Sequence, residues 1–171
     1  MVSLARESLA AEGESPDSAG LHISVIPRRK VVRLAYDAPF TYGRRGAHWY
    51  GVHVRLAESL SAVLHATVHA YVFDPDELEQ VQGFGDGRRV GGERLRYEDA
   101  EAGELELTES QFAALQQKWP LGHLAYVFGV TRKELLRLPR SQSVLVSLDG
   151  RGSPTELTEL WTSALAASAG P

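Results

Sequence analysis

The stretch 48–97 constrains the possible folds of this chain most, because its helix, strand and turn patterns together fit one simple arrangement. Apolar residues three or four apart, among them Leu56 and Leu60, predict an amphipathic helix over 48–65. Three strand-like runs follow, at residues 67–73, 79–85 and 88–97. Asp86-Gly87 separates the last two runs, and this dipeptide suits the positive φ angles of a two-residue hairpin turn. The stretch therefore predicts a helix packed on an antiparallel sheet.

The rest of the chain extends this arrangement. Further strand patterns lie at residues 21–27, 30–36 and 143–149, and Ser153-Pro154 begins a predicted C-terminal helix. Capping boxes at Thr108 with Gln111 and at Thr131 with Glu134, and between them an apolar pattern that ends at Gly129, predict three short helices, which form a small lobe over 109–138. We expect an α+β fold: a mostly antiparallel sheet packed by the amphipathic helix and the C-terminal helix, with the three-helix lobe. The second face of the sheet is then polar, covered by the lobe, or used for a partner.

Length and composition predict one core. With 171 residues, of which 43% are hydrophobic and 23% charged, the chain can bury one sizeable core, so we expect a single domain over residues 21–171. Residues 1–20 combine a weak helical pattern with a loose polar stretch, which predicts a flexible N-terminal arm.

Composition also narrows the classes of function. The chain has no cysteine, which excludes thiolate nucleophiles, disulfides and cysteine-ligated metal sites. A formal net charge of -4 gives no overall basic field for nucleic acid, so binding of this kind needs a local patch. No apolar run approaches the roughly 20 residues that span a bilayer, and no secretory leader pattern is present. We therefore expect a cytoplasmic protein that does not enter a membrane.

The segment 121–138 has the residue types of two packed helices joined by a tight turn. These are the small residue between helices, the turn glycine, the buried turn residue, the cap of the second helix and its inward positions: Ala125, Gly129, Val130, Thr131, Leu135 and Leu138. The resemblance is to the helix-turn-helix motif of DNA-binding regulators. It implies that four side chains would face the major groove or its phosphates: Thr131, Arg132, Lys133 and Arg137. The same residues also suit any packed corner of two helices.

Two basic clusters are candidate sites for an anion or an acidic partner. Arg28, Arg29 and Lys30 lie in the turn between the first two predicted strands. Arg44 and Arg45 lie between two glycines just before the amphipathic helix, where helix N-terminal amides and arginines together can bind an anion. The second cluster leaves open a small enzyme with an anion site near these two arginines.

Other reaction chemistry is not indicated. His65 and His69 have zincin spacing, but Ala66 occupies the place of the required glutamate, and the pair straddles a predicted helix-to-strand junction. The phosphate-loop, dinucleotide and nucleophile-elbow patterns do not occur. We therefore predict no catalytic residue, no metal ligand and no cofactor.

These patterns favour a non-catalytic protein that recognises another protein. Glycines in the hairpin leave backbone exposed, at Gly83, Gly85, Gly91 and Gly92. Small single-domain bacterial proteins of this make-up include toxin-neutralising immunity proteins and adaptor or regulatory modules. The alternatives are a DNA-binding regulator that uses residues 121–138 and the small enzyme described above, and the sequence leaves the oligomeric state open.

Overall fold

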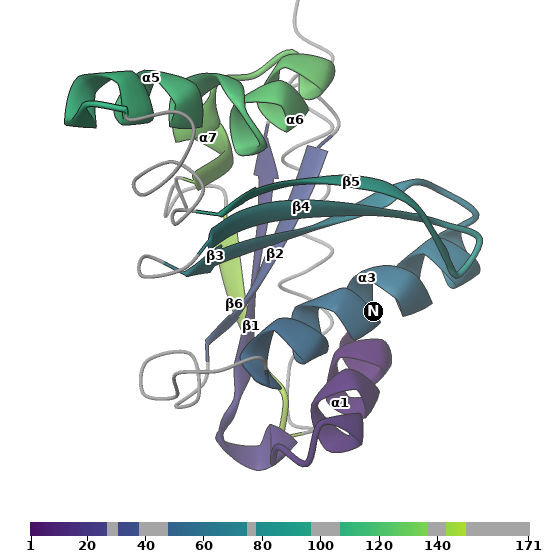
Figure 1. Cartoon of the computed structure of the whole chain (residues 1–171). Helices are drawn as coiled ribbons and strands as arrows, with labels where there is room; N and C mark the ends of the chain where they lie inside the picture. The colour runs from purple at the N-terminus through teal and green to yellow at the C-terminus, as the bar shows by residue number, and fades with distance from the viewer. Residues whose placement is uncertain (27–30, 38–47, 75–77, 97–106, 137–142, 150–171) are drawn as a thin grey trace, which may run out of the picture. The chain divides into compact units, whose positions relative to one another are not determined.

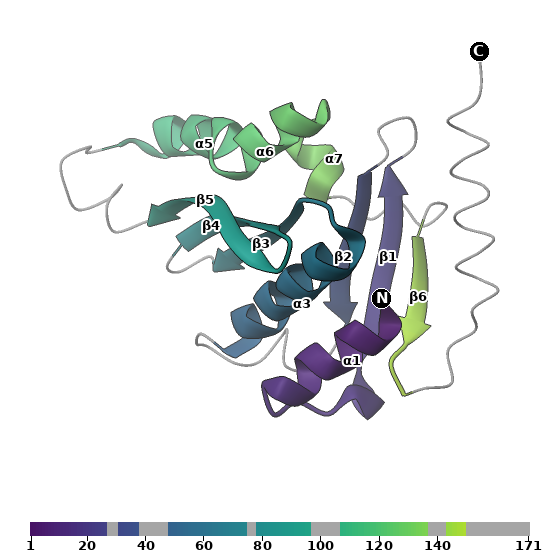
Figure 2. The ribbon, with the colours of Figure 1, turned by 90° about the vertical axis from the view of Figure 1, so that its right-hand side faces the viewer.

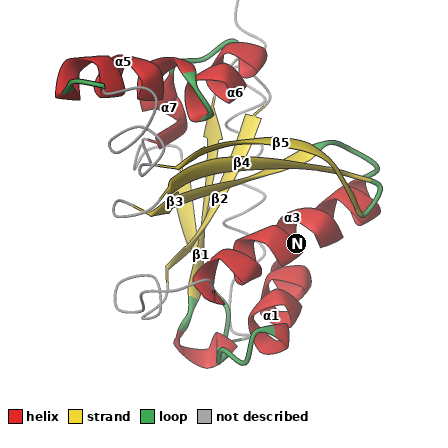
Figure 3. Cartoon of the chain, in the orientation of Figure 1, coloured by secondary structure: helices red, strands yellow, loops and turns green. Residues whose placement is uncertain are grey.

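The computed structural model describes residues 1–26, 31–37, 48–74, 78–96, 107–136 and 143–149 (Figure 1). Its helices are α1 (Val2–Ala11), the short 3-10 helix η1 (Pro16–Ser18), α3 (His48–Leu64), α5 (Glu109–Lys118), α6 (Leu121–Phe128) and α7 (Arg132–Leu136). Its strands are β1 (Gly20–Ile26), β2 (Val31–Asp37), β3 (Val68–Asp74), β4 (Leu78–Gly85), β5 (Arg88–Arg96) and β6 (Ser143–Ser147). Figure 3 shows these helices and strands by colour, and they confirm the α+β class. The predicted C-terminal helix lies outside the described residues.

The strands pair as two antiparallel sheets, in the orders β2-β1-β6 and β3-β4-β5. The strand patterns predict one sheet for all of them, whereas the structure contains two. The reason is that β1 pairs with β6, from Gly20 opposite Ser147 to Ser24 opposite Ser143. Local alternation of apolar residues identifies a strand, but it does not specify a partner so far along the chain.

The chain divides into two compact units, which we describe separately. Unit 1 contains residues 1–52 and 133–171, and unit 2 contains residues 53–132. The single domain expected over residues 21–171 stays a prediction.

The first residues of unit 1 form helix α1 where the sequence predicts a flexible arm over residues 1–20. Ala5 and Leu9 of α1 are fully buried, and Figure 2 shows the helix against the sheet of unit 1. The Tyr36 hydroxyl donates a hydrogen bond to the Ala5 carbonyl at 3.1 Å, and the Arg6 guanidinium donates one to the Leu148 carbonyl. The buried side chains of Ala5 and Leu9 and these two hydrogen bonds therefore hold α1 in place, although the segment 1–20 is largely polar.

In unit 2 the sheet β3-β4-β5 lies between α3 on one face and α5 with α6 on the other (Figure 1). Ala57 of α3 packs with Ala70 and Phe84 in one buried cluster. Successive strand residues point to opposite faces, so His69 points away from α3, and its ring contacts Phe128 of α6 at a centroid distance of 5.5 Å. The lobe thus covers the second face of this sheet, which is one of the three arrangements that the sequence allows.

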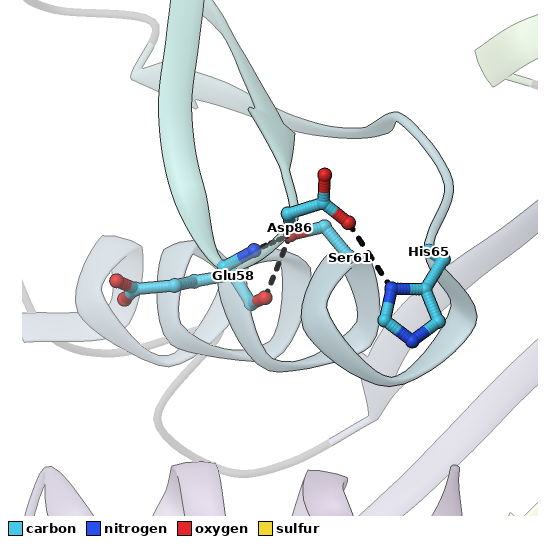
Figure 4. Close-up of polar contacts among 5 residues, drawn as sticks. Glu58, Ser61, His65 and Asp86 are labelled. Atoms are coloured by element: carbon cyan, nitrogen blue, oxygen red, sulfur yellow. Dashed lines mark hydrogen bonds and ion pairs between the residues drawn. The ribbon is translucent and has the colours of Figure 1, made fainter.

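The predicted hairpin turn is confirmed, and it is fixed to the end of α3. Asp86 and Gly87 have φ angles of 48° and 73°. The buried Ser61 hydroxyl accepts a hydrogen bond from the Gly87 N–H at 3.0 Å and donates one to the Glu58 carbonyl at 2.8 Å (Figure 4). His65 Nδ1 lies 3.2 Å from Asp86 Oδ1, but both side chains are exposed, so we assign this pair little stability. The turn therefore fixes where β5 begins.

Candidate functional site

Several predicted site residues lie outside the described residues. These are Arg28, Arg29, Lys30, Arg44, Arg45 and Arg137. The anion site near Arg44 and Arg45, and the small enzyme that would use it, therefore stay predictions.

The segment that resembles a helix-turn-helix does contain the expected helices and turn. Thr108 and Gln111 form the predicted capping box of α5. Gly129 ends α6 with a left-handed φ of 65°, and the Val130 N–H donates to the Ala125 carbonyl at 2.9 Å. Ala125 itself is buried, as the contact between packed helices requires. This geometry fits a helix-turn-helix and an ordinary helical corner equally well.

The candidate DNA contacts in this segment differ in their surroundings. Thr131 and Lys133 are exposed. Arg132 instead points into unit 2, where only 16% of its side chain is exposed and its guanidinium bonds Glu79. The DNA-binding alternative stays a prediction, and in this structure it would have to work without the Arg132 side chain on the surface.

Glu79 and Arg132 form the most buried ion pair that the structure describes. Arg132 Nη2 lies 3.3 Å from Glu79 Oε2 and 3.4 Å from Oε1, and the Glu79 side chain is 0% exposed. The same carboxylate accepts hydrogen bonds from the Tyr71 side chain and from the backbone N–H of Leu121, the first residue of α6. We call Glu79, Arg132, Tyr71 and the Leu121 N–H the Glu79 cluster.

The Glu79 cluster fixes the lobe to the sheet. Burial raises the pKa of Glu79, while the charge of Arg132 and the hydrogen bonds oppose that rise. A carboxylate at the N-terminus of a helix is also stabilised by the helix dipole. All these partners come from within unit 2, so the cluster joins β4 to Tyr71 of β3, to the start of α6 and to Arg132. The carboxylate is shielded from an external substrate because its side chain is fully buried.

Two further contacts hold α6 on the same face of the sheet. His123 Nδ1 lies 2.6 Å from Glu93 Oε1 of β5, and the His69 ring meets the Phe128 ring edge to face, at an interplanar angle of 88°. The helix is therefore held at its first residue, near its middle and at its last residue, so α6 has a fixed position on the sheet.

His69 makes the stability of unit 2 sensitive to acid. Its Nδ1 atom is buried without a hydrogen-bond partner among the described residues, and burial lowers the pKa of the ring. The folded protein then binds fewer protons here than the unfolded chain does, so this contribution is present above the ordinary pKa of about 6.5 and is lost as the pH falls below it.

We expect His69→Phe to remove this acid sensitivity, because it keeps the ring contact with Phe128 and cannot titrate. Urea unfolding at a series of pH values checks this expectation. Between pH about 6.5 and 5, the free energy of unfolding of the wild type should fall relative to that of the variant. Parallel curves for the two proteins would contradict the prediction.

Two surface features of unit 2 lie beside these contacts. The exposed side of α6 carries Tyr126 and Val127, whose side chains are 82% and 63% exposed. Strand β5 carries four exposed arginines: Arg88, Arg89, Arg94 and Arg96. Neither feature was predicted from the sequence. The arginines of β5 could have been found from the spacing of Arg94 and Arg96, since residues two apart on a strand point to one face.

The described residues meet the requirements of neither a metal site nor a membrane-spanning helix. Their His, Asp and Glu side chains do not gather in groups of three or more that could hold a metal ion. His65 follows the end of α3 and His69 lies within β3, as the sequence predicts, so the two do not share a helical turn. No described helix is both long enough and apolar enough to cross a membrane.

The geometry of unit 2 thus offers a helix fixed on a sheet, with an apolar surface on the helix and a basic edge on the sheet. Comparisons of the chain with protein-family models, with curated proteins and with solved structures found no match.

Proposed function

We propose that this chain is a binding protein that recognises another protein through the outer face of α6. The observation that supports this proposal is the adjacent pair Tyr126 and Val127, which are 82% and 63% exposed on a helix whose inner residues Leu121 and Ala125 are almost fully buried. Single exposed apolar residues are normal on a protein surface. An exposed tyrosine next to an exposed valine, on a helix fixed at three points, forms a larger and more rigid contact surface than a single exposed residue does.

The fixed position of α6 favours recognition for an energetic reason. Binding costs free energy when side chains and loops become ordered at an interface. The Glu79 cluster and the contact between His69 and Phe128 already order this helix in the free protein. Tyrosine is also enriched among the residues that dominate binding energy at interfaces. A partner would therefore meet a surface that needs little rearrangement.

Purification of the tagged chain from its native cell tests the proposal. We expect one protein partner in stoichiometric amount, and we expect the double variant Tyr126→Ser, Val127→Ser to recover at least about tenfold less of it, which corresponds to about 1.4 kcal/mol of binding free energy.

A matched control variant is Val63→Ser, Leu64→Ser, which removes two apolar side chains of similar exposure, 62% and 60%, from the end of α3. This control should recover the partner as the wild type does. Purification of the chain without any partner, or an equal loss in both variants, would contradict recognition through α6.

A further inference from the structure

We infer that the outer edge of β5 binds an extended acidic segment of a partner protein, which adds to the sheet as a further antiparallel strand. This inference rests on the proposed function, because it names a second contact and the chemistry of the same kind of partner. Three features of β5 support it: its position at the edge of the sheet, its charge, and the register of its pairing with β4.

Strand β5 is an edge of the sheet β3-β4-β5. Its only strand partner among the described residues is β4, so the backbone N–H and C=O groups on its other side face away from the sheet. Unpaired groups of this kind form a template on which an extended peptide can pair. Eight of the nine residues of β5 are at least partly exposed, and only Leu95 is buried.

The usable part of this edge runs from Gly91 to Arg96. The pairing of these residues with Leu78 to Gly83 of β4 is continuous, whereas the register shifts between Gly83 and Phe84. A bulge twists the strand and disrupts pairing nearby. Six residues with regular register therefore remain for an added strand.

The positive charge of this edge favours an acidic segment as the added strand. Arg94 and Arg96 pair with Gln80 and Leu78 of β4, so both lie on one face of the sheet, two residues apart. They are exposed, and no described residue forms an ion pair with them. Glu93, the only acidic residue of β5, is bonded to His123. The edge is therefore basic in a chain whose formal net charge is -4.

Side chains alternate between the two faces of a sheet, and this alternation predicts the sequence pattern of the partner segment. In an added strand, the residues opposite Arg94 and Arg96 would also be two apart and on the same face. Aspartate or glutamate at these two positions can accept two hydrogen bonds from each guanidinium. The residue between them would lie on the face of the buried Leu95, where an apolar side chain fits. The expected pattern is acidic, apolar, acidic.

Charged edge strands also have a plain structural role, because charge on an edge discourages unwanted pairing between sheets. That role needs positive charge alone. Strand addition needs both the guanidinium positions and the backbone groups of the partner, and nucleic acid would supply phosphates without strand pairing. These three readings make different predictions about a peptide probe.

A fluorescently labelled eight-residue peptide that alternates glutamate and valine is the probe, titrated against the full chain at low salt and followed by anisotropy. We expect saturable binding. A peptide of the same composition with its glutamates in one block should bind at least about tenfold more weakly. A version of the alternating peptide, methylated at the alternate backbone amides that would pair with β5, should bind more weakly by the same factor. Equal binding of the three peptides, or binding of a single-stranded oligonucleotide but not of the peptide, would overturn the inference.

Two variants with the same loss of charge locate the site. Arg94→Gln, Arg96→Gln should weaken peptide binding at least about tenfold, whereas Arg88→Gln, Arg89→Gln, at the bulged end of β5, should leave it within about twofold. Circular dichroism checks that both variants stay folded, as exposed substitutions should. Equal weakening by both variants would show that charge alone attracts the peptide, and would overturn strand addition.

The variant Tyr126→Ser, Val127→Ser separates this inference from the proposed function. It leaves β5 unchanged, so it should bind the peptide as the wild type does. If the natural partner is lost from this variant but the peptide does not bind the wild type, the proposed function stands and the edge inference fails. If the peptide binds as expected but no natural partner is recovered from cells, recognition through α6 fails instead.

Discussion

Replacing Arg132 with methionine should lower the free energy of unfolding by about 3 kcal/mol at neutral pH. The change removes the counter-ion of Glu79, whose side chain is 0% exposed, while methionine keeps much of the packing volume. A buried charge that loses its partner is far more costly than an exposed one. Urea unfolding measures the loss. Lys133→Met, an exposed charge change at the next residue, is the matched control and should stay within about 0.5 kcal/mol of the wild type.

The penalty of Arg132→Met should also depend on pH. Burial already raises the pKa of Glu79, and loss of the positive charge raises it further. The folded variant then holds a proton that the unfolded chain releases, so its stability rises as the pH falls through the folded-state pKa of Glu79. The penalty should therefore be largest at neutral pH and smaller in acid.

A double variant identifies the cause of this loss. Glu79→Gln removes the negative charge but keeps an oxygen that can accept from the Leu121 N–H. Glu79→Gln, Arg132→Met should therefore be more stable at neutral pH than Arg132→Met alone. If the double variant is less stable still, or if Arg132→Met behaves like Lys133→Met, the ion pair does not hold the lobe.

Replacing Leu9 with alanine should cost about 3 kcal/mol, because it leaves a cavity where a fully buried side chain of α1 packs. A residue in a flexible arm would instead tolerate this change within about 0.5 kcal/mol. Thermal and urea unfolding distinguish the two results. Leu4→Ala, in the same helix but only half-buried, is the control and should cost clearly less. Equal, small losses for both variants would show that α1 does not contribute to the core.

Local patterns predicted the parts of the fold that depend on neighbouring residues. The Asp86-Gly87 turn and the capping box of Thr108 with Gln111 were predictable because each involves residues within one turn. The ending of α6 at Gly129 was predictable for the same reason, since glycine readily adopts the left-handed conformation that ends a helix.

Features that depend on distant residues could not be predicted in this way. The pairing of β1 with β6 and the hydrogen bond from Arg6 to the Leu148 carbonyl both bring together the two segments of unit 1. Glu79 lies in an alternating strand pattern, where a charged residue reads as solvent-facing, and its partner Arg132 is 53 positions away. The basic edge on β5 was overlooked because its meaning depends on β5 being the last strand of its sheet.

The sequence of unit 2 lies between the two segments of unit 1, and this order decides when each strand of unit 1 is synthesised. Unit 2 is one continuous stretch, so all of its residues have been synthesised before β6 exists. Unit 1 needs β6 beside β1, and the Leu148 carbonyl that receives Arg6 emerges later still. Contacts between distant residues form slowly because a long loop must close. Strand β1 therefore lacks β6, its second neighbour, until all of unit 2 has been synthesised.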